Sequence, residues 1–269
     1  TLTRNRQVKE IHATDGHRWF IRCGVGDRST KEVVTTSLKA GDRLVTKFPR
    51  TRIERSTPSP FGIAHGFTFG DGMRLQKGSV AQLCPPKDLA MLRYFPNSRT
   101  RDKEGNLHVI DLPRFFKELP DLDEAIPYLY GWLAGYFAAD GCVAADGTVI
   151  LNSARKENLE FVRALCSRLG IGTYGITHQM RQGFPGRELS ALYRVHLINE
   201  DLRENFFVMD HHRERFATAH KNFARRGWVV RSVEATDRVE EVYCAEVEDG
   251  HAFTLEDNIL TGNCFGCQE

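Results

Sequence analysis

The chain has 269 residues, of which 41% are hydrophobic and 27% are charged, and a formal net charge of +2 at pH 7. This length predicts about two globular domains, and the near-neutral charge means that any nucleic-acid contact must come from local patches. No apolar run reaches the roughly 18 residues of a membrane span and no signal peptide is visible, so we expect no membrane partner. Seven irregularly spaced cysteines predict free thiols in a reducing cytoplasm.

Residues 1–57 predict short strands followed by a linker. Strands are expected at 8–14, 19–22 and 32–36, and the dipeptide Asp15-Gly16 predicts a tight turn after the first of them. The basic segment 47–60 contains three prolines, which is typical of a domain boundary.

An internal repeat follows the linker. Gly62–Gly72 and Gly131–Gly141 align with glycines, aromatic residues and an Asp-Gly pair in register, at an offset of 69 residues. A β hairpin is expected after each Asp-Gly pair, and a helix after each hairpin, at 87–95 and at 156–169. This agreement favours a duplicated module.

The two aspartates of the repeat predict a metal site. Each ends an apolar helix, and Gly66 and Gly135 allow two such helices to approach closely. Packed together, the helices would bring Asp71 and Asp140 to one point, where two carboxylates repel each other unless protonated or bridged by a cation. Mg²⁺ binds such acids together with phosphate oxygens, which suits phosphodiester hydrolysis.

The last part of the chain predicts strands again and ends on a reactive pair. Strands are expected at 228–234 and 241–248, and 252–255 and 258–260 flank a turn. The layout therefore predicts one β domain interrupted by an inserted module.

At the end of the chain, Asn263 precedes Cys264. An Asn carboxamide can cyclise and break the peptide bond after it, and a Cys thiolate forms thioesters.

Within the inserted module, Leu133–Gly141 resembles the signature of the LAGLIDADG homing endonucleases, and Ala64–Gly72 resembles a diverged first copy in which His65 and Phe69 depart from the motif. Ala138 also departs, where the family often has a second acid. The resemblance covers residues 58–205 and implies a pseudo-dimeric αββαββα nuclease, a monomer whose sheets lie over the major groove of double-stranded DNA.

By the same resemblance, Asp71 and Asp140 bind Mg²⁺. The alternative is a helix-packing motif that has lost nuclease activity. Three arginines with suitable neighbours are expected to contact DNA, although a solvated polar face explains each of them equally well: Arg181, Arg187 and Arg194. A lysine near the metals is also implied, and the sequence does not choose between Lys77, Lys87 and Lys156.

The flanking segments resemble an intein, a Hint-fold protein-splicing domain. Thr14 and His17 match its TxxH block, in which a hydroxyl and an imidazole polarise a peptide bond. Segments 242–253 and 258–264 match its two C-terminal blocks. The implied chain is α+β: a mostly-β Hint domain (1–57 and 206–263), incomplete because the block upstream of Thr14 is missing, interrupted by the endonuclease. We therefore expect that this chain alone does not splice.

Details of the blocks resemble class 3 inteins. Trp19, Cys244 and Thr261 occupy the positions typical of that class, and Gly262 replaces the usual penultimate His. The resemblance implies that Cys244 attacks the upstream junction and passes the acyl group to Cys264, after which Asn263 cyclises. Trp19 is then expected to pack around Cys244, and Thr261 to orient its thiol. His251 is expected to assist Asn263; an ordinary loop histidine is the alternative.

Residues 264–269 belong to the flanking host sequence in this interpretation. Their CxxC resembles half of the zinc ribbon of phage and bacterial DNA primases, so the host is expected to be a primase in a bacterial or phage-infected cell. Two ligands make no zinc site within this chain, and splicing needs no cofactor.

Three alternatives remain open: a free-standing LAGLIDADG endonuclease or binding protein, a Hint domain that cleaves without ligating, and an inactive remnant that binds DNA.

Overall fold

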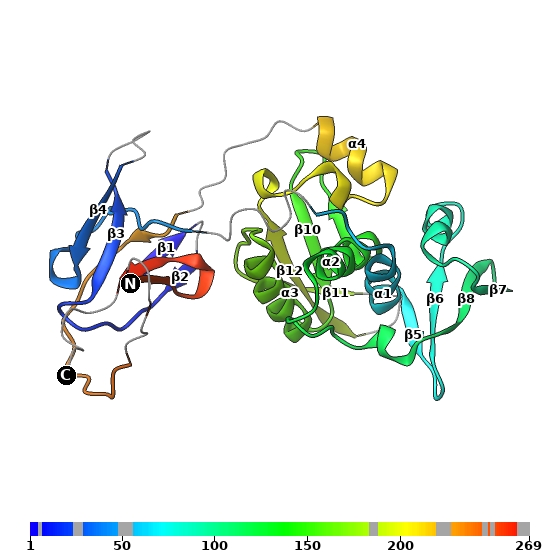
Figure 1. Cartoon of the computed structure of the whole chain (residues 1–269), viewed down its shortest axis with the longest axis horizontal. Helices are drawn as coiled ribbons and strands as arrows, with labels where there is room; N and C mark the ends of the chain where they lie inside the picture. The colour runs from blue at the N-terminus through cyan, green and yellow to red at the C-terminus, as the bar shows by residue number, and fades with distance from the viewer. Residues whose placement is uncertain are drawn as a thin grey trace. The chain divides into compact units, whose positions relative to one another are not determined.

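The computed structural model describes residues 1–4, 7–23, 29–47, 56–182, 188–218, 227–243, 247 and 251–262. The chain divides into two compact units, one formed by residues 1–48 with 225–269 and the other by residues 49–224. Both are drawn in Figure 1. Segments from the two ends of the chain thus share one unit.

The second unit contains two four-stranded antiparallel sheets with the same strand order. The first half of the duplication gives the order β5-β6-β8-β7, and the second half gives β9-β10-β12-β11. The first sheet comprises β5 (Gly72–Arg74), β6 (Ser79–Leu83), β7 (Arg99–Lys103) and β8 (Asn106–Leu112). The second comprises β9 (Gly141–Val143), β10 (Val149–Ser153), β11 (Thr177–Gln182) and β12 (Leu189–Leu197). The matching order supports the duplication seen in the sequence.

Two helices, α1 (Pro60–Gly70) and α2 (Ile126–Asp140), pack against each other over their lengths and lie side by side in Figure 1. A Cβ added at Gly66 would lie 1.9 Å from the Trp132 carbonyl oxygen, and one at Gly135 would lie 2.1 Å from that of Ile63. Such distances exclude any side chain, so the glycines bring the two backbones into contact as the sequence predicts.

The remaining helices differ between the two halves. In the second half, α3 (Lys156–Leu169) spans the predicted residues and ends at Gly170 with φ 82°. In the first half, the helix predicted at 87–95 is shorter than expected and is a 3-10 helix, η2 (Leu89–Tyr94). Met91 and Phe95 of that segment are buried in the core, and Leu92 and Tyr94 are half-buried against it. The short helices η3 (Arg114–Lys117), η4 (Asn199–Asp201) and η5 (Glu204–Phe206) and the helix α4 (Asp210–Thr218) complete the unit.

The second unit continues beyond the boundary expected at residue 205. Phe206, Phe207 and Phe216 are buried in its core, where the Phe206 ring stacks on Tyr130 at a centroid distance of 6.0 Å. Residues 206–216 therefore pack with the inserted module rather than with the flanking segments.

The first unit contains two sheets. The smaller has the order β13-β1-β2 and comprises β1 (Leu2–Arg4), β2 (Gln7–Lys9) and β13 (Val229–Val230). The larger has the order β14-β15-β3-β4 and comprises β3 (Arg18–Arg22), β4 (Thr30–Val34), β14 (Ala252–Thr254) and β15 (Leu260–Gly262). The short helices η1 (Thr35–Ser37) and η6 (Glu256–Asn258) belong to the same unit. Among the described residues of this unit, the core cluster consists of Leu2, Trp19, Leu44, Trp228, Val230 and Ile259.

Two predicted strands of this unit are shorter than expected, and the described part of a third is not a strand. The strand expected at 8–14 ends at Lys9, and the one expected at 228–234 is reduced to Val229–Val230. Among the described residues of 241–248, none lies in a strand. Val242 and Tyr243 are 66% and 86% exposed, so their alternation with polar residues does not mark a buried face.

Within the part of the chain that the structure describes, no helix is both long enough and apolar enough to cross a membrane.

Candidate functional site

Two acidic residues end the paired helices of the second unit. Asp71 caps α1, its N–H donating to the Phe67 carbonyl over 2.9 Å, and Asp140 is the last residue of α2. A Cβ added at Gly70 would lie 3.1 Å from Asp140 Oδ2. The Asp140 carboxylate therefore lies against the last turn of α1, one residue before Asp71.

Both carboxyl groups resist ionisation. Burial and, after it, the charge of Asp88 together raise the pKa of Asp71 to about 6, while Lys87 and Lys117 oppose the rise. Burial raises the pKa of Asp140 to about 7, with repulsion from Asp71 as the second cause. Because the two carboxylates repel each other in a partly desolvated site, a cation between them would stabilise both charges.

Lys117 supplies a cation that the sequence analysis missed. Its ammonium donates hydrogen bonds to the Thr68 carbonyl, over 3.1 Å, and to the Phe69 carbonyl, at the end of α1. Burial lowers the pKa of Lys117, and the charges of Asp140 and Asp71 act in the opposite direction. The amine is thus held between the helix end and the two acids.

The lysines that the sequence offered as candidates lie away from the acid pair or affect it only through their charge. Lys156 is exposed on α3 and pairs with Glu160 over 2.7 Å. Lys87 lies 3.6 Å from the buried Asp88 carboxylate, and its charge lowers the pKa of Asp71 and Asp140 from a distance. Lys117 was missed because it lies far from both repeats in the sequence and reaches them only through the fold.

The donor set fits a metal that keeps most of its coordination for water and substrate. Among the described residues, no group of three or more His, Cys, Asp or Glu side chains is arranged to hold a metal ion. Two carboxylates without nitrogen or sulfur ligands suit Mg²⁺, which takes one or two protein acids and completes its shell with water and phosphate oxygens. They do not suit a structural zinc site.

The structure describes two of the three arginines that are expected to contact DNA. Arg181 on β11 pairs with Ser190, and Arg194 on β12 pairs with Thr177, so the alternation along the two strands puts both arginines on one face of the sheet. The buried Val195 points to the other face, toward the core. Arg187 lies outside the described residues.

The first sheet carries a corresponding basic row that the sequence analysis also missed. Arg99, Arg101 and Lys103 alternate along β7 and are all exposed. Arg101 pairs with His108, while Val109, the next residue of β8, is buried in the core. The basic residues therefore share the sheet face that points away from the core. Their alternation with Thr100 and Asp102 was a usable signal.

In the first unit, the structure brings together three residues expected from the intein resemblance. Trp19 on β3 pairs with Thr261 on β15, and His17 lies two residues before Trp19. The His17 ring hydrogen-bonds through Nε2 to the Thr261 hydroxyl and lies edge-on to the Trp19 ring at a centroid distance of 4.9 Å. Thr261 also donates to the Arg18 carbonyl over 2.8 Å, and burial lowers the pKa of His17.

The other residues of that expected site are less constrained or not described. The His17 N–H donates to the Thr14 carbonyl over 3.1 Å, which closes the predicted turn, and Thr14 is exposed. His251 is exposed at φ 46°, in a turn before β14. Cys244, Asn263 and Cys264 lie outside the described residues, so the placement of Trp19 and Thr261 around the Cys244 thiol stays a prediction.

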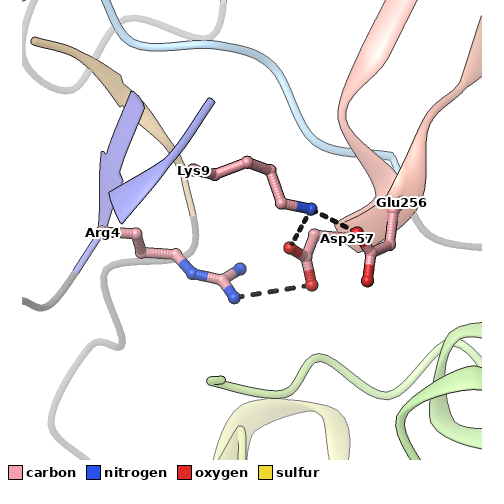
Figure 2. A network of polar contacts seen from close by, with 4 residues as sticks. All are labelled: Arg4, Lys9, Glu256 and Asp257. Atoms are coloured by element: carbon pink, nitrogen blue, oxygen red, sulfur yellow. Dashed lines mark hydrogen bonds and ion pairs between the residues drawn. The ribbon is translucent and has the colours of Figure 1, made fainter. Parts of the chain in front are cut away.

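A network of charged side chains holds the segment before β15 (Figure 2). Lys9 contacts Glu256 over 2.7 Å and Asp257 over 2.8 Å, and Arg4 lies 3.7 Å from the second oxygen of Asp257. The Arg4 guanidinium also lies over the Trp228 ring at 4.5 Å. The network fixes the start of the strand that carries Thr261.

Comparison with known proteins places a recognised domain within the second unit. Residues 127–208 match the family model described as a LAGLIDADG-like domain. The chain is thus an α+β protein that contains such a domain, and the match covers α2 and the second sheet. A comparison with curated proteins gives no match.

Solved structures with a distant likeness include homing endonucleases. Mesophilic variants of I-DmoI share 14% identity over 61% of this chain and 97% of theirs, with a TM-score of 0.35. A variant of I-DmoI in complex with its target DNA in the presence of magnesium shares 12% identity over 60% and 97%, with a TM-score of 0.37. The N-terminal LAGLIDADG domain of DUF199/WhiA shares 14% over 55% and 88%, with a TM-score of 0.34.

Proposed function

We propose that the second unit is a Mg²⁺-dependent endonuclease that cuts double-stranded DNA at a defined site. The observation that carries this proposal is the approach of Asp71 and Asp140 at the ends of glycine-paired helices, with a pKa raised to about 6 and about 7. The LAGLIDADG-like match over residues 127–208 supports it.

Each part of the site has a role in this proposal. The bound ion supplies Lewis-acid activation of the phosphate and of the attacking water. Asp71 and Asp140 hold the ion, and Lys117 places a positive charge beside the phosphate. The basic row on β7, together with Arg181 on β11 and Arg194 on β12, holds the DNA backbone along the two sheets.

The target follows from the insertion of this module in a second domain. We propose that it is the host gene without the coding sequence of this chain. The expected result is that the full chain linearises a plasmid carrying the joined flanking sequences when Mg²⁺ is present, and that Asp140→Asn lowers the rate at least about 100-fold. Asp146→Asn, which neutralises an exposed aspartate of a nearby turn, serves as the matched control.

Cutting by Asp140→Asn at the wild-type rate would show that the acid pair is not the active site. If the wild-type chain never cuts this plasmid, the module only binds DNA or is a remnant.

A second proposal concerns the first unit: we infer that it belongs to a protein-splicing domain. The observation in its favour is the contact of His17 and Trp19 with Thr261, two residues before Asn263. In this proposal Cys244 opens the upstream junction, Cys264 accepts the acyl group and Asn263 cyclises. The flanking host protein, which we propose to be a primase, is then joined. Cleavage without ligation is the competing outcome.

Splicing is tested in a precursor that includes the residues encoded upstream of Thr1 and the host sequence downstream. Cys244→Ala should abolish cleavage at the upstream junction, because the first nucleophile is lost. Thr261→Val should slow the same step, because the valine keeps the shape but removes the hydroxyl that contacts His17. Ligated product from Cys244→Ala at the wild-type rate would contradict the class 3 mechanism.

A further inference from the structure

His65 is a buried histidine that neither proposed chemistry uses. It lies in α1, is 1% exposed, and departs from the repeat motif at its position. Burial lowers its pKa to about 4, so the ring is neutral at ordinary pH. A neutral, fully buried imidazole must find one donor and one acceptor, and its partners identify its task.

The partners of His65 fix the orientation of the ring. Nε2 lies 3.0 Å from the Glu118 carbonyl oxygen, which can only accept, so Nε2 carries the proton. Nδ1 lies 2.6 Å from the Tyr128 hydroxyl, which therefore donates to it. The hydroxyl, the ring and the carbonyl form one chain that links α2, α1 and the segment 115–118.

The same ring also packs on that segment. The Phe116 ring is stacked on it at a centroid distance of 5.0 Å and an angle of 10°, and the Phe115 ring stands perpendicular to it at 5.5 Å. One imidazole thus contacts residues 115, 116 and 118 and leaves out only Lys117.

Lys117 reaches the same face of α1 one turn further on. Its ammonium contacts the carbonyls of Thr68 and Phe69, which follow His65 by three and four residues and therefore lie along the same side of the helix. The other polar anchor of the segment is an ion pair of Glu118 with Arg74, and both of those side chains are exposed, so it contributes little.

We propose that His65 is a positioning residue that holds Lys117 at the acid pair, a role that rests on the nuclease function proposed above. The imidazole fixes the backbone on both sides of Lys117, and the lysine side chain then has one direction in which to extend. His65→Gln keeps an amide that can donate to Glu118 and accept from Tyr128, whereas His65→Leu keeps only volume.

The first test measures the accessibility of the Lys117 amine to an acetylating reagent in the metal-free full chain, by mass spectrometry, with Lys156 as the exposed internal reference. We expect slow modification in the wild type and in His65→Gln, and about tenfold faster modification in His65→Leu. Tyr128→Phe removes one hydroxyl and keeps the aromatic ring, so it should give a smaller increase in Lys117 modification. This variant carries the test if His65→Leu does not fold. His212→Leu removes another buried imidazole, one that packs on Phe137, and should change nothing.

The second test measures DNA cutting by the same variants. His65→Leu should lower kcat with little change in KM, and His65→Gln should restore most of the rate.

Unchanged Lys117 reactivity in both His65→Leu and Tyr128→Phe would overturn the inference, and so would an equal increase in His212→Leu. If the reactivity changes as expected but the wild type cuts no DNA, the positioning of Lys117 stands and the nuclease proposal fails.

Discussion

At the scale of single residues, the two aspartates illustrate what a sequence can predict. Their meeting point follows from local patterns, since each ends an apolar helix with glycines spaced for close packing. Lys117 follows from no such pattern, because its place at the end of α1 depends on a buried contact between His65 and Glu118. Residue types that act through tertiary contacts are invisible to periodicity and spacing.

The raised pKa values predict how pH affects the metal-free protein. Between pH 4 and 7 the unfolded chain loses the Asp71 and Asp140 protons while the folded chain keeps them, so stability falls as pH rises and levels off above about 7. Asp140→Asn removes one buried charge, and it also removes the repulsion that this charge exerts on the Asp71 carboxylate. Its Tm at pH 8 with a chelator should exceed that of the wild type, by about 2–4 °C for each 1 kcal/mol relieved.

The control for this prediction is Asp146→Asn. The pKa of Asp146 is lowered by hydrogen bonds from Thr148, so this substitution should bring no gain at pH 8. A wild type and an Asp140→Asn variant with the same Tm at pH 5 and at pH 8 would contradict the raised pKa of Asp140.

At the scale of elements, strong patterns predicted well and weak ones failed. The helix at 156–169 was found with its bounds because it has an amphipathic stripe and a terminal glycine. The strand expected at 241–248 had only short alternation, and its residues Val242 and Tyr243 are exposed. The segment 87–95 forms only a 3-10 helix over Leu89–Tyr94, although Met91 and Phe95 are buried in the core. An apolar pattern in the sequence therefore predicts a helix or strand well when the folded chain provides an apolar surface on which that side of the element packs.

The exposed faces of β7 and β11 predict the DNA-binding surface. Arg101→Ala and Arg181→Ala should each weaken binding to a DNA duplex, and each lost phosphate contact should reduce the slope of log K against log salt by about 0.9. Met180→Ala is the matched control, because this exposed side chain lies on the opposite face of β11. Titrations at several salt concentrations measure the slopes. An equal loss of DNA affinity in Met180→Ala would show that binding does not depend on the arginine-bearing face of the sheet.

At the scale of the whole molecule, each of the two units has its own hydrophobic core and its own proposed site. Asp71, Asp140 and Lys117 belong to one unit, and His17 and Thr261 belong to the other. The β-rich ends and the duplicated middle of the sequence favour such a division. The sequence did not predict that residues 206–216 pack with the inserted unit, because their aromatic residues have no periodic pattern.

Separate cores predict separable chemistry. In the precursor described above, Asp140→Asn should abolish DNA cutting and leave the yield of ligated product unchanged, while Thr261→Val should slow splicing and leave DNA cutting unchanged. Both activities are measured on the same preparations. Loss of splicing in Asp140→Asn would show that the two units depend on each other.

The central claim is that Asp71 and Asp140 hold one divalent ion between the ends of α1 and α2. Titration of the full chain with Mn²⁺, followed by paramagnetic broadening of backbone amide signals, tests it directly. The prediction is that the Gly70 and Gly141 amides broaden together at the lowest Mn²⁺ concentrations and that Asp140→Asn abolishes both effects. Signals at both helix ends that stay sharp while amides elsewhere broaden would contradict the claim.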